Sequence, residues 1–243
     1  MADAIRQRDS RLVETEREKG ELLHSMYPSG VAERVRSGTE VTAETISNVT
    51  VAVTLIDGLD VLAADRSAPE VRAILNALLD SLNNAAASHG VEPLRSVGES
   101  YIGVCGLSSP YLDHATRTLA WARTATLALE RMGEEWARSV SLRFGLASGE
   151  IDVLLITRGH TANDIWGHTL GVARRIVQEA DPGCVRVSES TYALLTDVDG
   201  FEPCPPIETP AFGTIMTWSR SAVERVTPDV SAGPKTRAPS DGQ

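Results

Sequence analysis

Short runs of β-branched residues alternate along this chain with stretches whose apolar positions have helical spacing. The dense apolar run Val49–Ile56 predicts a largely buried central strand that ends at Asp57. Apolar residues in Pro69–Gly90 form a single stripe, which predicts a helix packed on the core. The segment Val91–Leu107 predicts a β-hairpin with Glu99 near its turn.

The second half of the chain continues this mixture. In order, its pattern predicts a helix over Asp113–Ala137, strands over Ser139–Ala147 and Ile151–Ile156, a polar loop over Thr157–Asn163, a helix from the Trp166-Gly167 turn to Ala180, a strand over Val185–Val187, a capped helix over Ser188–Leu195 and a strand over Thr214–Trp218. Helices and strands interleave without a regular βα period. We therefore expect an α+β fold with a mixed or antiparallel sheet flanked by helices.

Both ends of the chain differ from this central pattern. Residues 1–26 are dense in charge and predict a helix, which is either a short dimeric coiled coil or connector, or a solvated terminal helix. A second short helix follows Pro28. Residues 221–243 have few large apolar side chains, as is typical of a disordered tail. The predicted organisation is N-terminal connector helices over 1–38, one domain over 39–220 and a tail over 221–243.

Composition narrows the classes of function. The formal net charge of −10 argues against general nucleic-acid binding but permits a small phosphorylated ligand in a local basic pocket. No apolar run approaches the roughly 20 residues of a transmembrane segment, and the polar N-terminus is unlike a signal peptide. The three cysteines lack CxxC spacing, which favours reduced thiols in the cytoplasm.

The stretch Asp164–Arg175, DIWGHTLGVARR, combines an acid, a Trp-Gly turn and paired arginines. This pattern predicts a loop whose acid contacts a ligand, followed by a helix whose cations face anionic groups. Adjacent residues on a helix point about 100° apart, so at most one of Arg174 and Arg175 faces such a ligand.

Four segments follow one another in a specific order and spacing, namely VTVAVTLIDGL, RSVGES, LRFGLASGE and DIWGHTLGVARR. Together they resemble the catalytic domain of the class III nucleotidyl cyclases, the adenylate and guanylate cyclase family, from about Leu22 to Trp218. The resemblance implies the ferredoxin-like cyclase fold and a head-to-tail dimer, either a homodimer or a heterodimer with another cyclase domain. It also implies attack of a ribose 3′-oxygen on the α-phosphate of a nucleoside triphosphate such as ATP, assisted by Mg²⁺ or Mn²⁺.

The resemblance implies two metal-binding acids, and both positions depart from the family. Leu55 stands where the first acid is expected, and Asp57 lies two residues on, facing the same side of an extended strand. Asp57 is either a displaced metal ligand or a solvated or hydrogen-bonded loop acid. Glu99 matches the second acid, where the family prefers Asp; Mg²⁺ tolerates such a displacement poorly because it demands near-ideal octahedral geometry.

The resemblance also implies contacts to the base and the phosphates. Asp164 matches the base-selecting acid and favours adenine, whereas the partner lysine is replaced by Arg95, which is bulkier and forked. Arg175 matches the arginine that supports the transition state, so it is the cation that we expect to face the ligand. The companion asparagine is replaced by Gly171, and the late loop Thr209–Gly213 lacks the lysine that meets the polyphosphate.

These departures lead to three hypotheses. The first is a catalytically inactive or very weak pseudo-cyclase that binds nucleotide or pairs with another cyclase as a regulatory module. The second is a weakly active homodimeric adenylate cyclase that converts ATP to cyclic AMP and pyrophosphate. The third is a dimerisation module that has kept the fold and lost its ligand. The groups missing at Leu55 and Gly171 favour the first hypothesis.

Overall fold

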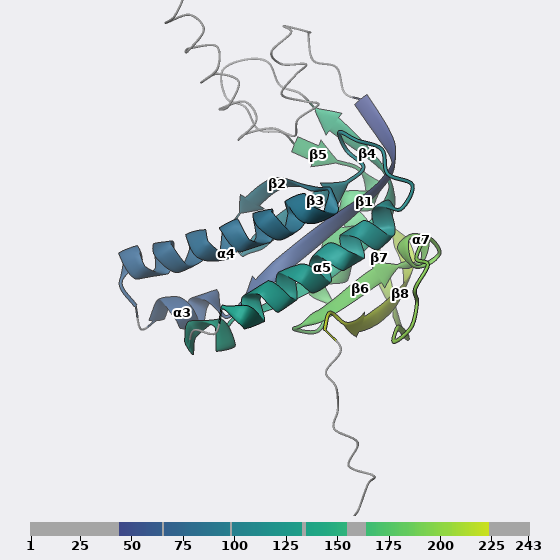
Figure 1. The fold of residues 1–243 in the computed structure, drawn as a ribbon. Coiled ribbons are helices and arrows are strands. Elements are labelled where there is room, and N and C mark those ends of the chain that lie inside the picture. Colours follow the sequence, from purple (N-terminus) through teal and green to yellow (C-terminus); the bar gives the residue numbers. More distant parts are fainter. Residues whose placement is uncertain (1–43, 65, 98, 133–134, 155–163, 224–243) are drawn as a thin grey trace, which may run out of the picture.

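The computed structural model describes residues 44–64, 66–97, 99–132, 135–154 and 164–223, which form one mixed sheet flanked by helices (Figure 1). Its strands are β1 (Glu44–Asp57), β2 (Val91–Val97), β3 (Ser100–Cys105), β4 (Ser141–Leu154), β5 (Asp164–Trp166), β6 (Cys184–Ser188), β7 (Glu202–Thr209) and β8 (Gly213–Ser221). Its helices are α3 (Leu59–Ala64), α4 (Ala68–His89), α5 (His114–Arg131), the 3₁₀ helix η1 (Glu135–Arg138), α6 (His168–Gln178) and α7 (Glu189–Tyr192).

The strand order is β2-β3-β1-β4-β6-β8-β7, with β5 paired to β4. Neighbouring strands are antiparallel except for β4 and β6, which are parallel. This arrangement confirms the predicted α+β fold with a mixed sheet. None of the helices in the described ranges is both long and apolar enough to cross a membrane. The predicted connector helices and nearly all of the predicted tail lie outside those ranges, so their boundaries stay predictions.

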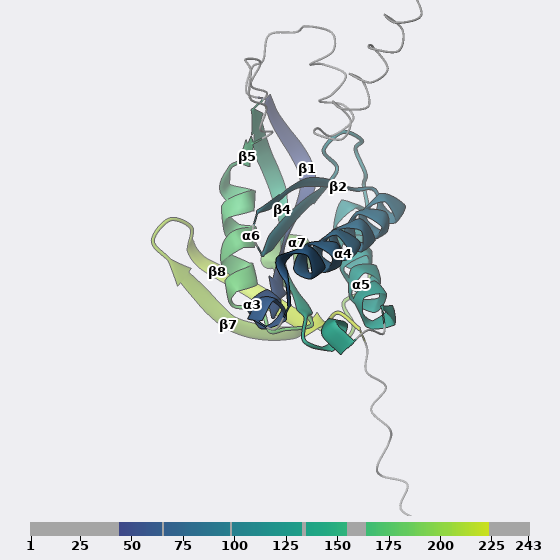
Figure 2. The ribbon, with the colours of Figure 1, turned by 90° about the vertical axis from the view of Figure 1, so that its left-hand side faces the viewer.

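β1 is an interior strand between β3 and β4, and its segment from Val49 to Ile56 is largely buried, with side chains in the clusters on both faces of the sheet. Ala52 and Ile56 belong to the core cluster formed with α4 and α5, whereas Val51 and Val53 belong to the cluster formed with α6. Figure 2 shows these helices on opposite sides of the sheet. Burial on both faces explains why this part of β1 is a run of apolar and β-branched residues and not an alternation of apolar and charged ones.

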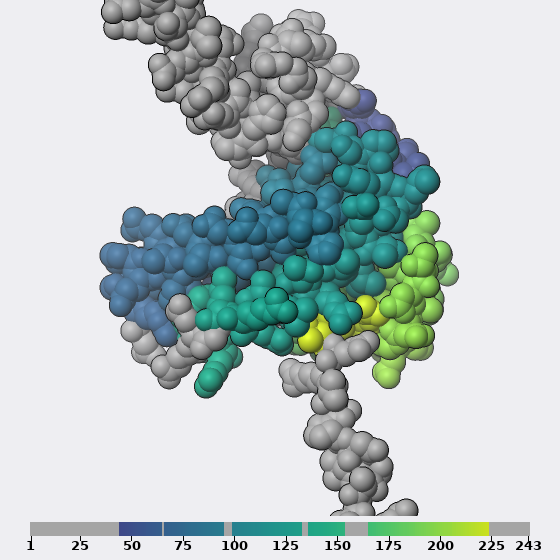
Figure 3. All heavy atoms as spheres, viewed as in Figure 1, coloured from purple at the N-terminus to yellow at the C-terminus, as the bar shows by residue number. Residues whose placement is uncertain are grey.

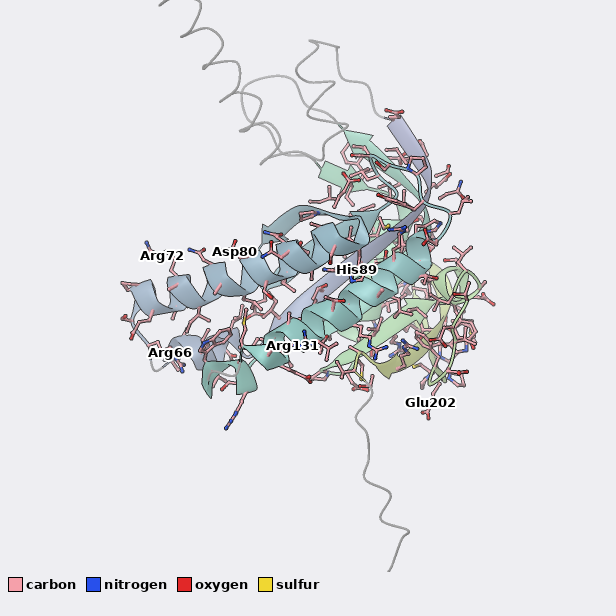
Figure 4. All side chains as sticks on the ribbon, in the orientation of Figure 1. Arg66, Arg72, Asp80, His89, Arg131 and Glu202 are labelled. Atoms are coloured by element: carbon pink, nitrogen blue, oxygen red, sulfur yellow. The ribbon has the colours of Figure 1, made fainter. Side chains whose placement is uncertain are left out.

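α4 and α5 lie side by side over one face of the sheet and dominate the view in Figure 3. α4 begins at a capping box in which Glu70 Oε2 accepts hydrogen bonds from Ser67 N at 2.9 Å and from Ser67 Oγ at 2.6 Å. Its outer side carries exposed charged residues such as Arg72 and Asp80 (Figure 4). The predicted core stripe of this helix is confirmed in part, since Leu78 and Leu82 are buried in the core and Ile74 and Leu79 pack against it.

α6 approaches β4 closely because β4 presents glycines to it. A Cβ added at Gly145 would lie 2.5 Å from Ala173 O, and one added at Gly149 would lie 2.6 Å from Thr169 Oγ1. A larger residue at Gly145 would require a backbone shift, and one at Gly149 would require the Thr169 side chain to move. The glycines of the LRFGLASGE segment thus place α6 against the sheet.

Three predicted elements were wrong in part. Ser148 and Gly149 do not separate two strands, because both residues pair with β1 and β4 runs through them without a break. The segment before the Trp-Gly turn is not only loop, since Asp164–Trp166 forms β5. The helix predicted over Asp113–Ala137 ends at Arg131 and is followed by η1.

β7 was not predicted, because its sequence EPCPPIET contains three prolines. It is an edge strand, and its register with β8 shifts between Cys204 and Ile207, where Pro205 and Pro206 lie. Arg186 of β6, which is only 7% exposed, anchors this edge by donating to Thr217 Oγ1, Glu179 O and Pro205 O at 2.9, 2.6 and 3.0 Å. The β7–β8 hairpin therefore has a firm base.

Candidate functional site

The C-terminal end of β1 meets the turn of the β2–β3 hairpin. The amide of Ile56 donates a 2.8 Å hydrogen bond to the carbonyl oxygen of Glu99, and Asp57 is the last residue of β1. The Glu99 side chain is exposed at this turn. The fold thus brings the backbone positions of Asp57 and Glu99, the two predicted metal acids, to one end of the sheet.

Leu55 occupies the position of the expected metal acid and packs against the apolar core. Its cross-strand neighbours are Ser100 on β3 and Arg143 on β4. The Leu55 side chain is partly buried and packs against the same apolar cluster as Val53 and Val104. A carboxylate at this position would face an apolar surface on one side and a guanidinium on the other.

Asp57 is engaged by an arginine that the sequence pattern marks only as a strand residue. Arg143 Nε donates to Asp57 Oδ2 at 2.8 Å, and Arg143 Nη2 donates to Oδ1 of the same carboxylate. The two side chains are 26% and 28% exposed. The hydrogen bonds to Asp57 are the largest cause of a raised pKa for Arg143, which therefore stays charged. The contact is a two-pronged ion pair.

The residues at this end of the sheet do not fit a divalent metal ion as they stand. Leu55 offers no ligand atom, and both oxygens of Asp57 already accept hydrogen bonds from Arg143. Within the described ranges, no group of three or more His, Cys, Asp or Glu side chains is placed to hold a metal. The metal-binding roles predicted for Asp57 and Glu99 stay predictions.

The predicted base-selecting residues are placed by their backbones alone. Asp164 opens β5 and pairs with Leu154 at the end of β4, and Arg95 lies in β2 opposite Ile102. The positions of these two side chains lie outside what the structure describes, so their roles stay predictions.

One face of α6 carries His168, Gly171 and Arg175, because residues three and four apart lie on the same side of a helix. We call this surface the α6 face. Arg175 Nη2 donates to Glu179 Oε1 at 2.7 Å, one turn further along the helix. The Arg175 side chain is 39% exposed, so it has a surface ion pair and remains accessible to an anion.

Phe212 covers the middle of the α6 face. A Cβ added at Gly171 would lie 2.3 Å from Cζ of the Phe212 ring, and this ring meets that of His168 edge-on with centroids 5.2 Å apart. Phe212 belongs to the turn between β7 and β8, the loop that lacks the expected lysine. Its role was not predicted, since only the combination of Gly171 with an aromatic residue in that turn could have indicated it.

The predicted metal acid Asp57 and the predicted base-selecting acid Asp164 lie at opposite ends of β4. Asp57 pairs with Ser141, the first residue of the strand, and Asp164 pairs with Leu154, the last. β4 has 14 residues, which correspond to about 40 Å at the rise of an extended strand. The acid predicted to select the base therefore cannot meet the predicted metal acids within one chain.

Comparison with known proteins agrees with this architecture. Residues 41–218 match the family model described as the adenylate and guanylate cyclase catalytic domain. The germination-specific adenylate cyclase of Dictyostelium discoideum is 27% identical over 218 residues, which cover 88% of this chain and 25% of that protein. An adenylate cyclase of Mycobacterium tuberculosis is 25% identical over 209 residues, covering 85% of this chain and 47% of that protein. The chain thus spans at most about half the length of these relatives.

Solved structures show the same fold. The guanylate cyclase domain of RhGC from Catenaria anguillulae, solved with GTP, superimposes with a TM-score of 0.66 at 24% identity and covers 75% of this chain and 100% of that one. The adenylyl cyclase CyaB from P. aeruginosa gives a TM-score of 0.64 at 18% identity, with 77% and 98% covered. The family match spans most of the chain and the described fold agrees with it: the chain belongs to the family of adenylate and guanylate cyclase catalytic domains.

Proposed function

We propose that this chain is a catalytically inactive or very weak cyclase domain that binds a nucleoside triphosphate or pairs with another cyclase domain as a regulatory module. The observation that carries this proposal is Leu55, a partly buried apolar residue that packs against the core at the position where the family is expected to hold a metal acid. Without that acid, the chain lacks a main ligand for the metal ions that would activate the attacking oxygen and neutralise the phosphates.

The separation of Asp57 from Asp164 along β4 supports a dimer, because a complete site needs residues from two chains. Each chain then contributes its β1 end to one site and its α6 face to the other. Leu55 damages the first contribution and Gly171 damages the second. In a pair with an active cyclase, each of the two sites would inherit one of these defects, so we expect pairing to inhibit the partner.

The predicted base and phosphate contacts indicate which nucleotide the chain would bind. Asp164 would accept a hydrogen bond from an adenine amine, with Arg95 as its companion, so ATP is the proposed ligand. Arg175 would contact its phosphates. The three cysteines lack CxxC spacing, and we propose reduced thiols in the cytoplasm.

A second candidate function is a weak adenylate cyclase that uses Mn²⁺ or Mg²⁺. The hydrogen bond from Ile56 N to Glu99 O favours it, because this bond holds the backbones of Asp57 and Glu99 at one end of the sheet. Turnover by this route would require Asp57 to leave Arg143. We rank this candidate second for that reason.

The decisive assay incubates the purified chain with ATP and Mg²⁺ or Mn²⁺ and measures cyclic AMP. We expect no product above the background without enzyme, together with an ATP-dependent rise in melting temperature. Product that disappears in Asp57→Ala or Glu99→Ala, but not in the control Asp60→Ala on the exposed side of α3, would establish the second candidate instead.

Pairing is tested by titrating the chain into a fixed amount of an active adenylate cyclase domain. The proposal expects cyclic AMP production to fall as mixed dimers form. Unchanged activity, with no mixed species in size-exclusion chromatography or native mass spectrometry, would rule out the regulatory pairing. A chain that neither pairs nor binds ATP would be a purely structural dimerisation module.

A further inference from the structure

The turn between β7 and β8 presents one side chain to the body of the protein. Pro210, Ala211 and Gly213 are exposed, whereas Phe212 is half-buried and packs against the apolar cluster beneath α6. Figure 2 shows this hairpin beside α6. The Phe212 ring therefore makes a specific contact with the body of the protein, since a turn without such a contact would leave the ring in solvent.

The turn is built to hold this ring in place. The amide of Phe212 donates a 2.9 Å hydrogen bond to Thr209 Oγ1, and Gly213 has a φ of +68°, a conformation that side chains disfavour. Arg186 fixes the strands behind the turn through Thr217 Oγ1 and Pro205 O. The hydrogen bonds of Arg186 thus tie the base of the hairpin to β6, whereas the hydrogen bonds of Thr209 and Thr214 at the tip join residues within the hairpin.

The ring fills the space that a side chain at position 171 would need. The nearest ring atoms lie 2.3, 2.9 and 3.1 Å from a Cβ built on Gly171, and the first two distances are shorter than real Cβ contacts. Gly171 stands between His168 and Arg175 on the α6 face, so the ring covers the approach to the middle of that face. An apolar ring there offers an anion no hydrogen-bond donor and excludes water that could solvate it.

We propose that Phe212 is an internal plug that closes the middle of the α6 face, at Gly171, to a nucleoside triphosphate, and that the tip of the β7–β8 hairpin must move away before phosphates bound at Arg175 can also lie against the helix there. This inference rests on the proposed function, because it assigns the phosphate contacts to the α6 face. It makes the aromatic residue in the turn a determinant of affinity. Because only open molecules bind, the apparent Kd equals the Kd of the open form divided by the fraction of molecules that are open.

The steric part of the proposal is tested by a sign reversal in thermal unfolding of the full chain. In the wild-type background, Gly171→Ala forces its Cβ into the ring and should lower the melting temperature by about 5 °C. In the Phe212→Ala background the space is open, so the same change should raise the melting temperature by roughly 1–4 °C through helix propensity. Met216→Ala, on the exposed side of the same hairpin, is the matched control and should leave the effect of Gly171→Ala unchanged.

The binding part is tested by calorimetric titration of wild type, Phe212→Ala and Met216→Ala with ATP, adenosine and inorganic triphosphate. We expect Phe212→Ala alone to bind ATP and triphosphate about tenfold more tightly, as follows if about one molecule in ten of the wild type is open. Adenosine should bind all three proteins equally, since the plug excludes phosphates and not the base.

Each outcome decides a different point. Gly171→Ala with the same effect in both backgrounds would overturn the contact, and equal ATP affinity of wild type and Phe212→Ala would overturn the plug while leaving nucleotide binding intact. Sign reversal without binding of ATP to any variant would overturn both the plug and the nucleotide-binding form of the proposed function. If Gly171→Ala does not fold in the wild-type background, the titration of Phe212→Ala still decides the proposal.

Discussion

Replacing Asp57 with asparagine would break the two-pronged contact with Arg143 while preserving the shape of the side chain. Fully exposed ion pairs contribute about 0.2–1 kcal/mol, whereas breaking a buried pair costs roughly 3–5 kcal/mol. The side chains of Asp57 and Arg143 are 28% and 26% exposed, so solvent screens the pair only in part. We therefore expect a loss of about 1–2 kcal/mol, or roughly 2–8 °C in melting temperature for a chain of this size.

A double-mutant cycle with Arg143→Gln isolates the pair from other effects of either change. The combined variant should lose less than the sum of the single variants, because the second change removes no further contact. Asp60→Asn, which alters an exposed acid three residues away, is the control and should be neutral within about 0.5 kcal/mol. Additive losses, or a stable Asp57→Asn, would refute the ion pair as a stabilising contact.

The same variants separate an ion-pair partner from a metal ligand. If Asp57 only pairs with Arg143, Mn²⁺ should shift the melting temperature of wild type and Asp57→Asn equally. A Mn²⁺-dependent rise that is present in the wild type and absent from Asp57→Asn would assign metal binding to this carboxylate. That result would also require Arg143 to release it, and would revive the weak-cyclase candidate.

Two further predictions concern the buried polar groups around β1. Thr54 Oγ1 is fully buried and has no hydrogen-bond partner among the described residues. Thr54→Val should therefore raise the free energy of unfolding in urea by about 1 kcal/mol, whereas a lower free energy of unfolding would reveal a partner such as a buried water. His114, whose Nδ1 lies 2.6 Å from Thr50 Oγ1, has a pKa lowered from 6.5 by burial. The unfolded chain then binds more protons below about pH 6.5, so stability should be complete above that pH and fall as the pH decreases. Melting curves from pH 5 to 8 should show a shallower fall for His114→Gln, with a residual slope from His89, whose pKa is also lowered by burial; an unchanged slope would exclude His114 as the source.

The elements that were predicted well are those whose signal is local and repeated. The buried run of β1 and the stripe of α4 each depend on many residues that agree with one another. β5 and β7 were missed because three residues or a proline-rich octapeptide form a strand only when a partner supplies the hydrogen bonds. The glycines of β4 resembled a turn, whereas their function is to admit α6. Both kinds of error come from contacts that no short window contains.

The chemical groups that the candidate site has and lacks can be predicted from the sequence alone. Leu55 cannot ligate a metal in any fold, and Gly171 cannot donate a hydrogen bond from a side chain, so the family and its missing chemical groups follow from the sequence. The neighbours of those positions do not. Asp57 and Arg143 are separated by 86 residues in the sequence and are brought together by the register of β1 and β4. Phe212 contacts Gly171 because the β7–β8 hairpin packs beside α6. These contacts depend on how the whole sheet is assembled, because each one joins segments that have no interaction until the chain has folded.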